Sequence, residues 1–243
     1  MCRWNGVIST LKSRIEIRIN MAFDQEWEKI FQSRNWGKYP SENLVRPVLS
    51  TYEKIADRKL IRCLDLGCGG GANTWFLSRE GFDTYAIDGS PTAIEQTNEL
   101  LKSQNLTCRS QVGDFVRLDY ANETFDFVVD MDAVQHNRWT DIKLIHSEIY
   151  RVLKPGGYIF GMSLNQETTG WETSQQLEPG TFKKFIKGFI QIDVTVHLFS
   201  KEELQEILKP YENVTIDRVL LTKDNGKESI SHFIFRAQKQ GLK

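Results

Sequence analysis

Short apolar runs alternate along the chain with segments whose apolar residues recur at helical spacing. Such an alternation predicts strand–helix–strand units on a mainly parallel sheet. The run at 125–134 is almost continuously apolar, which is typical of a strand buried on both faces. The other strands predicted in this series span 60–67, 83–90, 108–115 and 158–164.

Helix signals fill the gaps between these runs. Ser90 and Pro91 supply an N-terminal cap and a first-turn proline for a helix that extends to about residue 104. An apolar stripe within 141–157 predicts another helix, which we expect Pro155–Gly157 to end.

The last third of the chain departs from this rhythm. The segment at about 165–200 is polar with interspersed aromatic residues, and it predicts an insert on the substrate side. A helix follows, opened by the capping-box pair Ser200 and Glu203. Two further apolar runs, 213–221 and 230–237, are joined by turn residues and predict a terminal hairpin.

We predict a single domain over residues 21–243, with cap helices at about 21–58. Residues 1–20 are interpreted as a flexible N-terminal extension. Their charges are scattered and leave no apolar leader segment. A second methionine, Met21, then opens a helix-like segment.

The composition excludes some classes of protein but does not identify a function. The 243 residues carry a net charge of -1, which gives no argument for a nucleic-acid partner. No run reaches the roughly 18 to 20 apolar residues of a membrane span. The four cysteines form no C-x-x-C pair, so we expect a reduced, cytoplasmic setting and no metal site.

A glycine loop after the first strand carries the clearest chemistry. Gly67, Gly69 and Ala72 match the spacing that cradles a pyrophosphate. Asp88 ends the next strand, where a carboxylate accepts from the ribose of either a dinucleotide or S-adenosylmethionine. Asp65 distinguishes these two cofactors. A carboxylate at the loop mouth opposes the pyrophosphate of a dinucleotide and favours the cationic sulfonium and ammonium groups of S-adenosylmethionine.

Five segments, in order, resemble the motifs of class I S-adenosylmethionine-dependent methyltransferases. They read "LDLGCGGGANTWFL", "YAIDGS", "VGDF", "FDFVVDMDAVQH" and "EIYRVLKPGGYIF". The resemblance covers roughly residues 36–159 and the terminal hairpin. It implies an α/β fold with a doubly wound, Rossmann-like, seven-stranded and mostly parallel sheet that receives an antiparallel strand from the C-terminal hairpin. It also implies S-adenosyl-L-methionine as cofactor and S-adenosyl-L-homocysteine as product.

The same resemblance implies which residues meet the cofactor. Asp114 would accept from the adenine amino group, and Phe115 would flank the ring. Trp36, Tyr39 and Arg46 either close over the cofactor or pack as ordinary core residues. The implied cofactor-binding set is Asp65, Gly67, Cys68, Gly69, Asp88, Gly89, Ser90, Gly113, Asp114, Phe115, Asp130, Met131 and Tyr39.

The candidate catalytic residue is His136, just after the fourth strand. A neutral imidazole at this edge of a doubly wound sheet can accept a proton from a substrate hydroxyl. The alternative is a histidine that holds its loop in place. Trp171 and His197 are the candidate substrate contacts, with ordinary packing as the alternative for each.

The predicted reaction is methyl transfer by in-line displacement onto a small-molecule acceptor, such as a sugar or secondary metabolite. One modest insert and the lack of a basic arm favour a small acceptor over a polymer. A quinone, protein or RNA acceptor and a non-catalytic sensor or assembly partner stay as alternatives. We expect no nucleic-acid or membrane partner, and no pattern predicts an oligomeric state.

Overall fold

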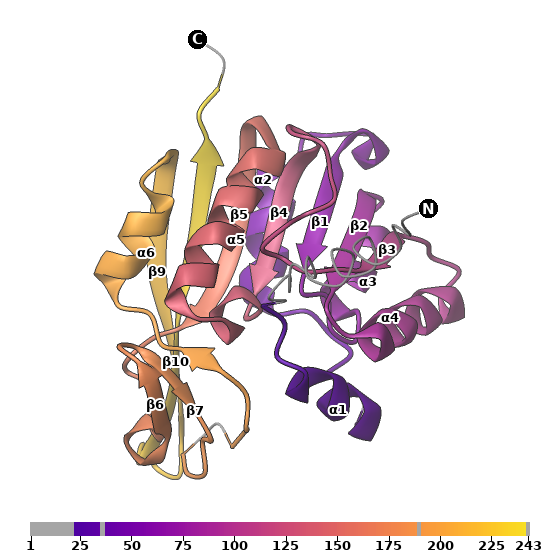
Figure 1. Cartoon of the computed structure of the whole chain (residues 1–243). Helices are drawn as coiled ribbons and strands as arrows, with labels where there is room; N and C mark the ends of the chain where they lie inside the picture. The colour runs from indigo at the N-terminus through magenta and orange to yellow at the C-terminus, as the bar shows by residue number, and fades with distance from the viewer. Residues whose placement is uncertain (1–21, 35–36, 189–190, 242–243) are drawn as a thin grey trace, which may run out of the picture.

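A seven-stranded sheet forms the centre of the protein, seen in a computed structural model that describes residues 22–34, 37–188 and 191–241 (Figure 1). The strand order is β3-β2-β1-β4-β5-β10-β9. Strands β1 to β5 are parallel, and β10 pairs antiparallel with both β5 and β9. The bounds are β1 (Arg62–Leu66), β2 (Asp83–Asp88), β3 (Arg109–Val112), β4 (Phe125–Met131), β5 (Leu153–Leu164), β9 (Tyr211–Lys223) and β10 (Glu228–Lys239).

This topology confirms the predicted α/β fold, including the antiparallel strand supplied by the C-terminal hairpin. The extension expected at residues 1–20 and the side chain of Trp36 lie outside the described residues.

Helices cover both faces of the sheet. Leu64 and Val128 meet Ile145 of α5 on one face. Cys63 and Phe127, their neighbours along the strands, meet α2 and α3 on the other. This alternation is the strand period of two, and it buries both faces. The helices are α1 (Glu26–Ser33), α2 (Glu42–Thr51), α3 (Ala72–Arg79), α4 (Pro91–Ser103), α5 (Trp139–Val152) and α6 (Lys201–Leu208), with 3-10 turns η1 (Arg58–Leu60), η2 (Val134–His136) and η3 (Trp171–Thr173).

The predicted helix caps and the predicted end of α5 are present. Ser90 accepts from the backbone of Ala93 at the start of α4, and Ser200 and Glu203 form the reciprocal capping box of α6. Helix α5 ends at Val152 with Leu153 as its C-cap, and the stop signal Pro155–Gly157 follows at once within the span of β5. The Thr124 amide donates to the Val152 carbonyl at 2.8 Å, so this terminal carbonyl has a partner outside the helix.

The polar segment before α6 forms a small antiparallel sheet of its own. Its strands are β6 (Gln175–Glu178), β7 (Thr181–Lys183) and β8 (Val196–His197). Figure 1 shows it beside the lower end of the β9–β10 hairpin. Thr168 and Thr169 bond to the β10 backbone at Ser231 and Ser229. The insert is therefore carried by the last hairpin rather than by the parallel strands.

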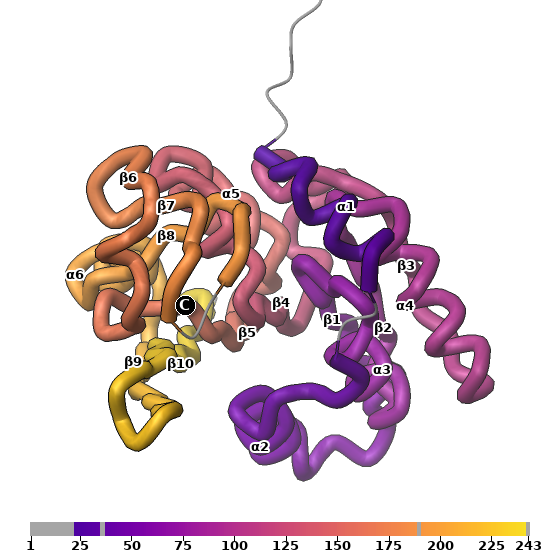
Figure 2. Tube along the Cα trace, turned by 90° about the horizontal axis from the view of Figure 1, so that it is seen from below, coloured from indigo at the N-terminus to yellow at the C-terminus, as the bar shows by residue number. Residues whose placement is uncertain are grey.

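Helix α1 lies apart from the sheet and bridges two regions. It packs on α4, and Figure 2 shows the two helices side by side. Its residues Trp27 and Ile30 also pack against the apolar core of the insert. The N-terminal segment thus closes a space between the carboxyl ends of the parallel strands and the insert.

Candidate functional site

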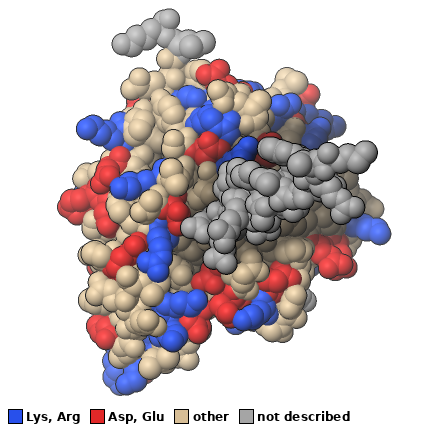
Figure 3. Space-filling view, viewed as in Figure 1, with Lys and Arg blue, Asp and Glu red and all other residues tan. Residues whose placement is uncertain are grey.

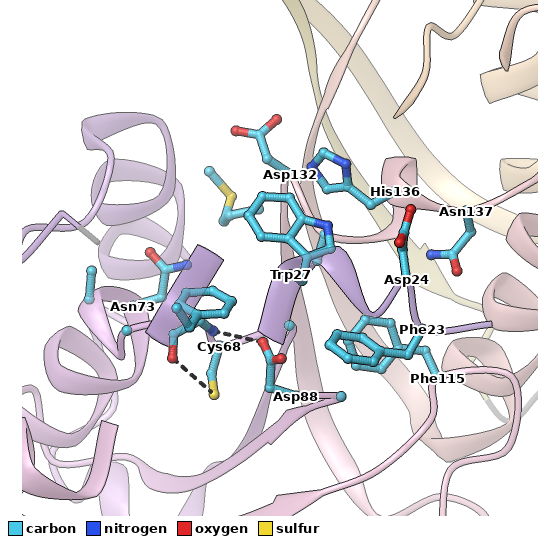
Figure 4. A pocket seen from close by; sticks show the side chains of 18 of the residues that line it. Phe23, Asp24, Trp27, Cys68, Asn73, Asp88, Phe115, Asp132, His136 and Asn137 are labelled. Carbon is cyan, nitrogen blue, oxygen red and sulfur yellow. Dashed lines mark hydrogen bonds between the residues drawn. The ribbon is translucent and has the colours of Figure 1, made fainter. Parts of the chain in front are cut away.

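A cavity of about 370 Å³ lies at the carboxyl ends of β1, β2 and β4 (Figure 4). Its size is that of a small-molecule site. We name two of its sides. The loop wall comprises the lining residues of 67–73, 88–89 and 113–115. The cap wall comprises Phe23, Asp24, Trp27, Phe31, Met131, Asp132, Ala133, His136 and Asn137.

The glycine loop turns back on β2 through its own backbone. Gly67 lies at φ +75, and a Cβ there would stand 2.3 Å from the Cβ of Ala133, so only glycine fits. The amides of Gly67 and Cys68 donate to the Ile87 carbonyl at 2.8 and 3.1 Å. The Gly69 amide donates to the Asp88 carboxylate at 2.9 Å. Because these amides are occupied, the loop does not offer them to a pyrophosphate.

Asp65 lies beneath the loop, not at its mouth as we expected. It is fully buried on β1 and does not line the cavity. The Thr74 hydroxyl donates to Oδ2 at 2.5 Å, while Oδ1 is buried and has no hydrogen-bond partner among the described residues. Burial raises the pKa of Asp65 to about 6, against the effect of the Thr74 hydrogen bond. A carboxylate with an unpaired oxygen here favours a cationic neighbour.

Two of the three residues predicted at the end of β2, Asp88 and Gly89, line the cavity, and Ser90 does not. Asp88 lines the cavity, and its pKa is raised by burial despite the amide bonds that it accepts. Ser90 is fully buried outside the lining, where its hydroxyl caps α4 and donates to the Glu28 carboxylate. The ring of Phe23 covers Gly89, since a Cβ there would come within 2.1 Å of it.

Asp114 and Phe115 line the far end of the loop wall beside Gly113. One Asp114 oxygen accepts from the Val116 amide at 3.0 Å and the other from the Ala22 amide at 2.7 Å. A carboxylate has about four acceptor sites, so Asp114 keeps capacity for a ligand amino group.

The residues at the end of β4 face in opposite directions. Asp130 is fully buried outside the lining, accepts from the amides of Ala133 and Val134, and has a pKa raised by burial to about 7. Met131 and Asp132 line the cavity. Asp132 adopts a left-handed φ of 62, and its Oδ1 lies 3.2 Å from His232 Nε2. Such a backbone in a non-glycine residue is maintained by its surroundings, here including the bond from its amide to the Met162 carbonyl.

His136 lies on the cap wall with one nitrogen occupied (Figure 4). Its Nδ1 lies 2.9 Å from the Thr195 carbonyl oxygen. A carbonyl only accepts, so Nδ1 carries the proton and Nε2 keeps its lone pair. Burial lowers the pKa of His136, although the Thr195 bond opposes it, so the ring is neutral near pH 7. The Trp27 ring meets it edge-on with centroids 4.7 Å apart.

The two predicted substrate contacts lie away from the cavity. Trp171 packs against Phe182 in the core of the insert, with ring centroids 5.3 Å apart. His197 is fully buried, stacks on Trp139 and shares a 2.8 Å hydrogen bond with the Thr181 hydroxyl. Both positions correspond to the packing alternative.

The structure gathers most of the predicted set and leaves the rest outside. Tyr39, 74% exposed, lines the rim, whereas the Arg46 side chain is exposed and pairs with Glu42. Outside the lining are Asp65, Ser90, Asp130, Trp171 and His197. Lining the cavity are Gly67, Cys68, Gly69, Asp88, Gly89, Gly113, Asp114, Phe115, Met131, Tyr39 and His136.

Sequence reasoning missed the N-terminal contribution to the cap wall. Phe23, Trp27 and Phe31 recur every four residues in "MAFDQEWEKIF", a spacing that places them on one helical face. This aromatic stripe could have been recognised in the sequence. The neighbouring residues gave no indication that it faces a cavity rather than a core.

Charge is mixed over the surface seen in Figure 3, where basic and acidic side chains are interspersed. Among residues 22–34, 37–188 and 191–241, no group of three or more His, Cys, Asp and Glu is arranged to hold a metal. Within the same ranges, every helix is too short or too polar to cross a bilayer.

Comparisons with known proteins find similarity to methyltransferases. A family described as "Methyltransferase domain" matches residues 63–157. The sterol 24-C-methyltransferase of Schizosaccharomyces pombe is 27% identical over 168 residues, covering 66% of this chain and 43% of that protein. The ubiquinone biosynthesis O-methyltransferase of Bartonella tribocorum is 28% identical over 137 residues, covering 52% and 55%. The chain thus spans about half the length of these relatives.

A solved structure supports the same fold. The SAM-dependent methyltransferase from Methanosarcina mazei superposes with a TM-score of 0.65 at 21% identity, covering 81% of this chain and 98% of that one.

Proposed function

We propose that the chain is a class I S-adenosylmethionine-dependent methyltransferase that transfers a methyl group to a small-molecule acceptor, such as a sugar or secondary metabolite. The observation that carries the proposal is one cavity with two kinds of wall. The loop wall holds carboxylates and occupied amides, and the cap wall holds a neutral histidine.

S-adenosylmethionine is the family's cofactor, and the residues present fit it. Asp88 would accept from the ribose hydroxyls, and Asp114 from the adenine amino group. Asp65 lies outside the lining, so its buried carboxylate, with one unpaired oxygen, would favour the ammonium group of the methionine portion through its charge or a water rather than by direct contact. The occupied amides of Gly67 and Cys68 argue against a dinucleotide.

The bound cofactor supplies a methyl group activated by its sulfonium, so the protein needs mainly to align the acceptor and exclude water. Trp27 and Phe23 wall the cavity against solvent. His136 Nε2 would accept the proton of an acceptor hydroxyl or amine, because its neutral form keeps a lone pair there. Asp132 and Asn137 beside it can position a polar acceptor.

A small acceptor is favoured over a polymer by what surrounds His136. Helix α1 and the insert meet across this side, through Trp27 packed against the insert core. A protein or RNA acceptor needs an open docking surface beside the reacting atom. The named relatives act on a sterol and in ubiquinone biosynthesis, which also favours a small molecule.

Calorimetry tests the cofactor step first. We expect S-adenosylmethionine to bind at micromolar concentration and NADH not to bind. A reversed preference would overturn the proposal. Screening candidate acceptors with a labelled methyl donor then tests turnover, and binding without transfer to any tested small molecule would favour the non-catalytic sensor.

His136→Ala tests the base with an acceptor found in that screen. We expect kcat to fall about 100-fold, since general-base catalysis contributes that much or more. The affinity for S-adenosylmethionine should stay within about twofold, because His136 lies on the other wall. A near-normal kcat would show that His136 only holds its loop in place.

A further inference from the structure

The N-terminal segment and the candidate base are joined through the insert. We infer that Asp24 is a positioning residue for His136, acting through Thr195 and setting which imidazole nitrogen can accept a proton. The inference rests on the proposed function for the use of that proton. Its test measures the histidine itself and needs no methyl transfer.

Asp24 lies just before α1, and its side chain is only 14% exposed. Its Oδ2 accepts from the Thr195 amide at 3.1 Å and from the Thr195 hydroxyl at 3.2 Å. Lys183 of β7 approaches the same oxygen at 3.4 Å. Burial raises the pKa of Asp24, but the bonds from Thr195 and Glu26 and the Lys183 charge outweigh it and hold the pKa below its usual value. An ionised acceptor makes these bonds stronger than neutral ones.

Thr195 connects Asp24 to His136. Its amide and hydroxyl bind Asp24, while its carbonyl accepts the Nδ1 proton of His136 at 2.9 Å. In a neutral histidine, the partner of one nitrogen decides where the proton sits. Fixing the Thr195 backbone therefore keeps the lone pair on Nε2.

A neighbouring amide supports the same tautomer. Gln135 Oε1 accepts from the Leu164 amide at 2.5 Å, which orients its NH₂ group toward His136 Nε2 at 3.5 Å. A donor on that side requires an unprotonated Nε2. At 3.5 Å the contact is weak, so an acceptor proton can compete for the lone pair.

The segment that carries Asp24 also walls the cofactor side of the cavity. Phe23 covers Gly89, and Glu28 accepts from the hydroxyls of Ser90 and Thr92 at the start of α4. Trp27 meets the His136 ring directly. The same short segment therefore encloses the cavity and fixes the tautomer of His136. His136 Nε2 is thus available to accept a proton when this segment is packed over the cavity.

The test is a nitrogen NMR spectrum of the full chain labelled with ¹⁵N-histidine, with and without S-adenosylhomocysteine. His136→Gln assigns the His136 signals. In the wild type we expect the Nδ1-protonated tautomer. In Asp24→Ser the side chain can still accept from Glu26 but is too short for Thr195. We expect the ratio of Nδ1- to Nε2-protonated forms to fall about tenfold, the worth of one lost hydrogen bond.

Two variants bracket this result. Thr195→Val keeps the amide bond and loses only the hydroxyl, so its ratio should lie between the wild type and Asp24→Ser. Asp193→Asn makes the same charge change at an exposed position of the insert and should leave the ratio unchanged. Circular dichroism checks folding, and if Asp24→Ser is unfolded, Thr195→Val carries the test.

An unchanged ratio in a folded Asp24→Ser, or an equal fall in Asp193→Asn, would overturn the inference. These outcomes are separate from those of the proposed function. A chain that fails to bind S-adenosylmethionine can still show the tautomer change. Conversely, an active enzyme with the wild-type ratio in Asp24→Ser would exclude Asp24 as a positioning residue.

Discussion

The two walls of the cavity are built by different means. The loop wall comes mainly from neighbouring strand ends and is held by backbone groups, with the Gly67 and Cys68 amides on the Ile87 carbonyl. The cap wall joins segments far apart in the sequence and is held by side chains, with Asp24 bonded to Thr195 and Thr195 to His136. Because backbone hydrogen bonds hold the loop wall, its conformation depends little on single side chains. Because side chains hold the cap wall, a single substitution can change its chemistry.

The largest expected effect is on the loop wall. Asp88→Ala removes the proposed ribose acceptor and the bond to the Gly69 amide. We expect affinity for S-adenosylmethionine to fall about 100-fold by calorimetry, since hydrogen bonds to a charged group contribute about 1.5–3 kcal/mol each. Asp83→Ala, at the far end of the same strand and paired with Arg109 and Arg62, is the matched control. An equal loss in both variants would point to a general effect on β2.

A pH series tests the loop side of the cavity and has the next largest expected effect. The pKa of Asp65 is raised to about 6, so the cofactor-free protein is stabilised by its protonation at low pH and loses that stability as pH rises through about 6. A cationic ligand favours the ionised form. We therefore expect affinity for S-adenosylmethionine to be about tenfold higher at pH 8 than at pH 5.

The thermal shift caused by the cofactor should follow the same direction and be larger at pH 8. Asp65→Asn should remove most of the pH dependence between these values. A steep dependence that persists in Asp65→Asn would assign the titration to another group, such as Asp130, whose pKa is raised to about 7.

The smallest expected effect concerns Trp171. Trp171→Leu removes part of the insert core against Phe182, and we expect it to lower the free energy of unfolding by about 1–3 kcal/mol. Denaturant unfolding measures this loss. The acceptor KM should stay within about twofold, because Trp171 does not line the cavity. A raised KM with unchanged stability would restore the predicted substrate contact.

Local physics explains which parts of the fold were predictable. Capping by Ser90 and the Ser200–Glu203 pair depends on residues within one turn, and both caps are present. The doubly wound, mostly parallel sheet followed from five motifs that occur in the order of the family they resemble. The end of α5 at Val152 was predictable as well, because the proline and glycines of Pro155–Gly157 act on the backbone next to them.

The candidate site was predictable on one side only. Asp88 and the loop glycines lie where the loop spacing places them. Asp24 was not singled out, since its role depends on Thr195, a residue 171 positions away. His197 was a candidate substrate contact, but it is fully buried and stacks on Trp139. Side chains that act through tertiary partners leave no periodic signal.

The attachment of the insert to β10 has a consequence for how this molecule can be altered. Thr169 donates its amide to the Ser229 carbonyl, and Asn165 donates its amide to the Ser231 carbonyl. Main-chain bonds of this kind are indifferent to most side-chain identities. The hairpin could therefore carry a different insert through the same main-chain hydrogen bonds. Chimaeras joined near Asn165 and Phe199, which also form an isolated bridge, should keep the loop wall intact. They should lose the bonds that join Asp24, Thr195 and His136 unless the new insert supplies them.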